Sequence, residues 1–113
     1  MEMDKKTQMN ITKLQMFEQK LQSVLMQKQT FQGQLLEVEN ALVELKGAET
    51  AYKIVGNIML SYSESDLTKD LEEKKISLES RLKKLEVEEK KIAEDSSSIR
   101  EELTEQMSKE KNE

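Results

Sequence analysis

Four residue types are missing from this chain, which contains no cysteine, no histidine, no proline and no tryptophan. Without cysteine and histidine, the chain cannot form disulfides, carry a thiolate nucleophile, hold zinc in an ordinary site or use a histidine proton shuttle near neutral pH. Without proline, nothing in the sequence forbids long unbroken helices. These absences exclude several classes of enzyme and leave helical architectures open.

Long hydrophobic runs are also absent. No apolar segment approaches the length of a transmembrane helix, and residues 1–6 (MEMDKK) lack the apolar core of a signal peptide. We therefore expect a cytoplasmic protein that does not bind a membrane.

Aromatic residues are scarce and charged residues are abundant. Of the 113 residues, 4% are aromatic, 35% are hydrophobic and 36% are charged. This composition is typical of long exposed helices rather than of a globular core. The net charge of −5 arises in the second half of the chain, because sixteen acids face eleven lysines and arginines from Gly56 onward. An acidic surface argues against nucleic acid as a partner.

The acidic residues are spaced as on the surface of a helix. The runs 72–75 (EEKK) and 86–91 (EVEEKK) place acids beside lysines three or four residues away, which stabilises a solvated helix. The sequence has no glycine-rich phosphate loop and no nucleophile paired with a base. We predict no catalytic residue, no metal site and no cofactor, and therefore a protein that is not an enzyme.

Apolar residues recur with a 3.5-residue period in the first part of the chain, which predicts a long helix at residues 4–46. Asp4 or Thr7 is suited to cap the start of this helix, and Gly47 to end it with a positive φ. With Leu14 taken as heptad position a, the a positions are Leu14, Leu21, Lys28, Leu35 and Leu42, and the d positions are Asn10, Phe17, Val24, Phe31, Val38 and Leu45.

A second helix is predicted at residues 65–108, followed by a frayed tail at 109–113. Its start contains the capping pattern Ser63 to Asp66. Its a positions are more polar than those of the first helix. The a positions are Lys75, Leu82, Glu89, Ser96 and Leu103, and the d positions are Leu71, Leu78, Leu85, Ile92 and Ile99.

Between the helices, residues 51–62 predict a β-hairpin. Gly56-Asn57 is the signal of a two-residue turn with glycine first, so Val55 and Ile58 should pair across it. Both faces of such a hairpin carry large apolar groups, and a lone hairpin is marginal in water. We therefore predict an intersubunit β-barrel, with the alternative that the hairpin folds back on its own helices. The predicted interface comprises Tyr52, Ile54, Val55, Gly56, Ile58, Met59 and Leu60.

The two helices fit each other as a long antiparallel intramolecular coiled coil. With Leu42 opposite Leu71, apolar residues meet along the seam, small Ser96 faces Phe17, and polar residues end the seam. The alternative is a parallel coiled coil between chains, which the central hairpin disfavours. The chain is thus predicted to be mainly α, with residues 1–113 in a single domain. The predicted layers include Leu35 with Leu78, Phe31 with Leu82, Leu21 with Ile92, Leu14 with Ile99, Asn10 with Leu103, and Thr7 with Gln106.

Methionines collect at the end of this coiled coil that is remote from the hairpin. Met9 and Met16 share heptad position c, outside the seam, and flexible methionine suits varied apolar contacts. We also expect the polar last layers to close poorly and to open easily. The alternative is that these methionines are scattered surface residues. The predicted adhesive residues are Met3, Met9, Ile11, Met16, Leu103 and Met107.

Two helical arms around residues 51–60 (AYKIVGNIML) resemble the beta-type subunit of the prefoldin family, a co-chaperone. The most specific part is the Tyr-Lys-x-x-Gly-Asn-Ile hairpin from Tyr52 to Ile58, and the run QKQT at 27–30 adds to it. The single hairpin matches the beta type, because alpha-type subunits carry two. The similarity extends over essentially the whole chain.

The resemblance implies a hexamer of two alpha-type and four beta-type subunits, joined through hairpins in β-barrels. It implies an ATP-independent molecular chaperone, or holdase, that binds unfolded polypeptides at the coiled-coil tips and delivers them to a group II chaperonin. A structural coiled-coil adaptor for one folded partner is the alternative function. Glu101, Glu102 and Glu105 are candidates to contact a basic chaperonin patch, although a solubilising role explains them equally well.

Overall fold

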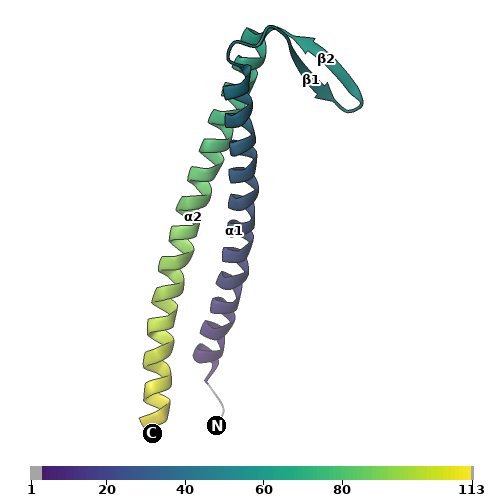
Figure 1. The fold of residues 1–113 in the computed structure, drawn as a ribbon. Coiled ribbons are helices and arrows are strands. Elements are labelled where there is room, and N and C mark those ends of the chain that lie inside the picture. Colours follow the sequence, from purple (N-terminus) through teal and green to yellow (C-terminus); the bar gives the residue numbers. More distant parts are fainter. Residues whose placement is uncertain (1–3, 113) are drawn as a thin grey trace. The chain divides into compact units, whose positions relative to one another are not determined.

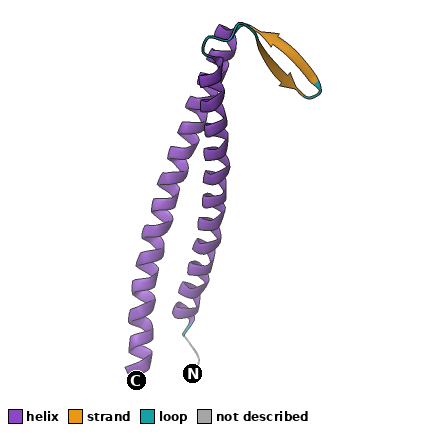
Figure 2. Ribbon diagram, viewed as in Figure 1, coloured by secondary structure: helices purple, strands orange, loops and turns teal. Residues whose placement is uncertain are grey.

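The computed structural model describes residues 4–112, with side chains up to residue 109. It contains helix α1 (Lys5–Leu45), strand β1 (Ala51–Val55), strand β2 (Ile58–Tyr62) and helix α2 (Glu64–Asn112), in that order (Figure 1). Figure 2 shows that strand is confined to the hairpin within the described residues and that helix makes up most of the rest. The predicted fold, two long helices on either side of one hairpin, is confirmed.

The chain forms two compact units, and each contains part of both helices. The described residues of the first unit are 4–28 and 84–112, and those of the second unit are 29–83. The hairpin belongs to the second unit. The contacts below lie within one unit or the other.

Helix α1 begins and ends at the predicted caps. The Asp4 carboxylate accepts a hydrogen bond of 2.7 Å from the backbone N–H of Thr7, which satisfies a donor that the first turn leaves free. This backbone hydrogen bond holds the pKa of Asp4 below its ordinary value. At the other end Gly47 has φ of 75°, and the backbone N–H of Ala48 donates to the carbonyl of Leu45.

Helix α2 is longer than the sequence pattern predicts. Its N-terminus is capped by Ser63, whose hydroxyl accepts a hydrogen bond of 3.1 Å from the backbone N–H of Asp66. Its C-terminus lies at Asn112, so residues 109–112 are helical rather than part of a frayed tail. The physical reason is composition, since lysine and glutamate are good helix formers and neither glycine nor proline occurs there to stop the helix.

The predicted a and d positions form the interior of both units. In the first unit Val24, Leu85 and Ile92 are buried, as are the polar residues Thr7, Asn10 and Ser96. In the second unit the buried seam residues are Val38, Leu45, Leu78 and Leu82. Residues on α1 contact residues on α2 in reverse order, so the antiparallel pairing within one chain is confirmed. The contacts that carry this direction are Asn10 with Gln106, Lys28 with Glu89, and Phe31 with Arg81.

The hairpin has the register that its turn predicts. Val55 pairs with Ile58, and Ile54 pairs with Met59, in an antiparallel two-stranded sheet. Gly56 has φ of 61°, and no described residue other than glycine has a positive φ. A positive φ at the first central residue alone is the pattern of a type II′ turn, which explains why glycine precedes Asn57.

The apolar core shared by the hairpin and the helices is confined to the base of the hairpin. Ala51 lies in a small core with Leu45 and Leu67, and Leu71 packs against this cluster. Beyond Ala51, every residue of both strands is exposed except half-buried Lys53. The alternative in which the helices cover the hairpin is therefore wrong, because the core ends at its first residue.

Candidate functional site

The hairpin carries an exposed apolar surface in the second unit. We define the hairpin surface as the exposed apolar side chains of β1 and β2. Their exposed fractions run from 36% at Tyr62 to 68% at Ile54. The sequence pattern identified all of these residues except Tyr62, which was missed because it stands at the end of the predicted strand. The hairpin surface comprises Tyr52, Ile54, Val55, Ile58, Met59, Leu60 and Tyr62.

Both faces of the hairpin contribute to this surface. The pairing register places Ile54 and Met59 together on one face, and Val55 and Ile58 together on the other. Within residues 4–112 the sheet has two strands, so each strand also has one edge whose backbone groups have no neighbouring strand. An apolar two-sided hairpin with two open edges has the features of an incomplete sheet.

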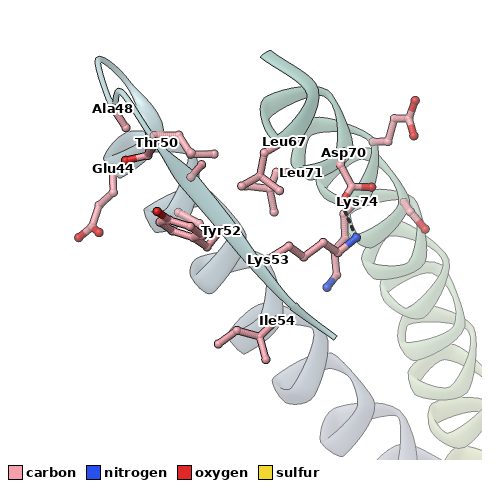
Figure 3. Close-up of a pocket in the computed structure, with 15 residues that line it drawn as sticks. Glu44, Ala48, Thr50, Tyr52, Lys53, Ile54, Leu67, Asp70, Leu71 and Lys74 are labelled. Carbon is pink, nitrogen blue, oxygen red and sulfur yellow. Dashed lines mark hydrogen bonds and ion pairs between the residues drawn. The ribbon is translucent and has the colours of Figure 1, made fainter. Parts of the chain in front are cut away.

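A groove runs between β1 and the helix ends of the second unit, with a volume of about 920 Å³ (Figure 3). Its floor includes Leu67 and Leu71, and Tyr52 and Ile54 line it from β1. Charged residues also line this groove. The charged lining residues are Glu44, Lys53, Asp70, Glu73 and Lys74.

Lys53 joins the hairpin to α2. Its ammonium donates a hydrogen bond of 3.1 Å to the Asp70 carboxylate and lies 5.8 Å from the centre of the Tyr62 ring. Figure 3 shows the Lys53 side chain reaching from β1 toward Asp70. The hydrogen bond to Asp70 raises the pKa of Lys53 above its ordinary value. Sequence reasoning gave Lys53 no such role, because the pair depends on how the hairpin meets α2.

Three methionines of the first unit are exposed. Met9, Met16 and Met107 have exposed fractions of 59%, 51% and 51%, and we call these three residues the methionine surface. Ile11 and Leu103, also predicted to be adhesive, are half-buried. Met3 lies outside the described residues.

The polar layers near these methionines are closed. Thr7 is fully buried, and Asn10 is 3% exposed and donates a hydrogen bond of 3.2 Å to the side-chain carbonyl of Gln106. No buried side-chain polar atom among the described residues lacks a hydrogen-bond partner. The expectation that these layers close poorly is therefore wrong, because Thr7 and Asn10 are buried and the Asn10 amide donates to Gln106 across the seam.

A groove of about 350 Å³ lies beside Met16 in the first unit. Phe17 and Ile99, both half-buried, line it together with Met16. The remaining lining residues are Lys13, Lys20, Asp95 and Ser98.

The three candidate glutamates are not equivalent. Glu101 and Glu105 are exposed, whereas Glu102 is half-buried and forms an ion pair of 3.6 Å with Lys6. Glu101 and Glu105 are therefore the more accessible members of the three. Their role remains a prediction.

Six further apolar residues are exposed that the sequence pattern did not single out. They lie at positions outside the a and d seam, and the only available signal was a large apolar side chain at a position expected to face water. They are Leu25, Met26, Leu36, Val43, Ile76 and Val87.

Within residues 4–112, no group of three or more acidic side chains is placed to hold a metal ion. In the same part of the chain, neither helix has an apolar stretch long enough to cross a membrane.

Two long helices that flank one apolar hairpin define a subunit of the prefoldin class. The sequence pattern of the prefoldin subunit family matches residues 8–110. The chain belongs to this family.

The relatives of this chain include prefoldin beta subunits. The chain is 37% identical over 87 residues to the prefoldin subunit beta of Archaeoglobus fulgidus, which covers 74% of this chain and 75% of the relative. It is 38% identical over 84 residues to that of Thermococcus onnurineus, with 72% of each chain covered. Its structure resembles the crystal structure of the prefoldin beta subunit from Thermococcus strain KS-1, with a TM-score of 0.85, 30% identity, and coverage of 92% of this chain and 94% of that one.

Proposed function

We propose that this protein is a subunit of an ATP-independent chaperone that holds unfolded polypeptides and delivers them to a group II chaperonin. The observation that carries the proposal is the set of exposed methionines, Met9, Met16 and Met107, outside the seam of the first unit. Long flexible side chains that are exposed to water and lie outside the packed seam suit transient contact with varied apolar segments.

Assembly is assigned to the hairpin surface. An apolar two-stranded sheet with open edges gains backbone hydrogen bonds and buries both faces when other hairpins join it. Prefoldin beta relatives support a hetero-oligomer. We propose two alpha-type and four beta-type subunits, joined through β-barrels, in the cytoplasm.

Neither assembly nor the holding of a client requires the protein to catalyse a reaction. Holding a client rests on many weak apolar contacts, and several copies in one assembly gain affinity through multivalency. The proposed role is therefore non-enzymatic and needs no cofactor. Glu101, Glu102 and Glu105 are proposed to contact the chaperonin, with the qualification that Glu102 is already paired with Lys6.

The test is suppression of aggregation of a chemically denatured model protein, followed by light scattering without nucleotide. The variant replaces Met9, Met16 and Met107 with serine. The matched control replaces Leu25, Met26 and Val87 with serine, because these three are similarly exposed and lie in the same unit. Both triple variants should keep the helical circular dichroism of the parent.

The methionine variant should lose holding activity, and the control should retain it. If the methionine variant and the parent are equally active at every ratio of subunit to client, the client must bind elsewhere, for example in the cavity beneath the barrels. Activity confined to one folded partner, with no effect on denatured proteins, would favour the adaptor.

A further inference from the structure

Two charged side chains occupy seam positions of the first unit. The Lys28 ammonium lies 2.7 Å from a carboxylate oxygen of Glu89, and the two side chains are 19% and 33% exposed. Each occupies an a position of its own helix, one layer apart across the seam. Val24 and Leu85, their neighbours on the seam, are both buried. The pair is therefore built into the packing rather than added to its rim.

The hydrogen bond between them is short and charge-assisted, and it raises the pKa of Lys28. Nevertheless, replacing such a shielded pair with leucines commonly leaves stability unchanged or increases it, because both charges lose water when the helices pair. A charged residue at a coiled-coil a position instead restricts which partner and which register the helix accepts. We propose that the Lys28–Glu89 pair selects the partner helix and the register of this coiled coil.

The apolar seam alone does not fix the register. Leucine and isoleucine repeat every seven residues on α2, so a shift by one heptad still places apolar groups opposite one another. The charged pair does not survive that shift. A shift in one direction brings Lys28 to Ser96, and a shift in the other direction brings Glu89 to Leu21. Either arrangement leaves a charge in the seam with no opposite charge.

The same pair disfavours association of like helices. In a parallel dimer a positions face a positions, so two α1 helices would place Lys28 against its own copy, and two α2 helices would do the same with Glu89. By contrast, α1 against α2, antiparallel and in the observed register, brings opposite charges together. An exchange of helices between two chains would preserve the contact, so the pair selects the identity of the helix and not of the chain.

Disulfide trapping in the full chain tests this proposal, because the sequence has no cysteine of its own. Cysteines introduced by Leu21→Cys and Ile92→Cys report the predicted native register. Cysteines introduced by Leu21→Cys and Leu85→Cys report a shift of one heptad. Leu21→Cys alone reports pairing of α1 with α1. Each probe is placed in three backgrounds. The first is the parent, and the second is the double-leucine variant, Lys28→Leu with Glu89→Leu. The third is the charge-reversed variant, Lys28→Glu with Glu89→Lys.

The parent and the charge-reversed variant should yield only the native crosslink. The double-leucine variant should unfold at the same or a higher denaturant concentration, yet also yield the shifted or the interchain crosslink. A double-leucine variant that yields only the native crosslink would overturn the proposal. A charge-reversed variant that yields non-native crosslinks would overturn it as well. If the double-leucine variant does not fold, Lys28→Glu alone decides: it must yield non-native crosslinks.

The control is the exposed ion pair between Lys6 and Glu102 in the same unit, whose side chains are 73% and 42% exposed. Lys6→Gln with Glu102→Gln removes a pair on the surface instead of in the seam and should leave only the native crosslink. Non-native crosslinks in this variant would mean that surface charge in general sets the register, which would also overturn the proposal.

Discussion

Truncation of Leu78 to alanine should destabilise the coiled coil strongly. Leu78 occupies a d position of α2 and is 4% exposed, so nearly all of its side chain is removed from water. The substitution deletes three carbon atoms, which at roughly 0.8 kcal/mol per buried methylene corresponds to about 2.4 kcal/mol. A cavity term adds to this loss, but a pair of helices collapses around a small void more easily than a globular core does. We expect the free energy of unfolding to fall by about 2–3 kcal/mol.

The matched control lies two residues away. Ile76 belongs to the same helix and is also a branched aliphatic residue, but it is 67% exposed, so Ile76→Ala should change the free energy of unfolding by less than about 0.5 kcal/mol. Urea unfolding of both variants, followed by circular dichroism at 222 nm and at equal protein concentration, gives the comparison. The midpoint of Leu78→Ala should fall by about 1–2 M relative to the parent. Equal midpoints for the two variants would refute the heptad assignment of α2.

Three further predictions concern the hairpin and the seam charge. Ile58→Asp should dissolve the assembly, seen by native mass spectrometry, while the helical circular dichroism persists; a variant that still assembles fully would contradict the role of the hairpin surface. Gly56→Val should weaken assembly as well, because φ is 61° there, and an assembly as stable as the parent would contradict the type II′ turn. The pKa of Lys28 is raised above 10.5 by the Glu89 hydrogen bond, so the stability that this pair supplies is complete below pH 10.5 and is lost as the pH rises further. The difference in urea midpoint between the parent and Lys28→Met should therefore shrink above pH 10.5, and a difference independent of pH would be evidence against the pair.

Periodicity made the seam and the hairpin predictable. Residues such as Val24 and Ile92 recur at the coiled-coil spacing, and burial follows that spacing closely. The hairpin register was predictable because Gly56-Asn57 admits few turn geometries, and the turn fixes every pair that follows. Local sequence thus determines both kinds of element.

Contacts between elements were harder to predict. The hydrogen bond from Asn10 to Gln106 joins residues that the layer assignment did not place opposite one another, since long side chains reach along the seam. The link from Lys53 to Asp70 depends on the angle at which the hairpin leaves the helices, which no local pattern encodes. Periodicity also predicts which apolar residues are buried but not which of the others have a role on the surface. The exposed residues Met26 and Ile76 were therefore not singled out from the sequence.

The open edges of the two-stranded sheet have a consequence for how a cell makes this protein. A copy synthesised in excess of its partners presents unpaired backbone groups and apolar strands to every other such copy. If the hairpin joins the assembly as proposed, balanced production of the subunits becomes a condition of solubility, and an exposed hairpin distinguishes an orphan subunit from an assembled one. A quality-control protease that recognises extended apolar segments would find its signal there and would lose it once the sheet is complete.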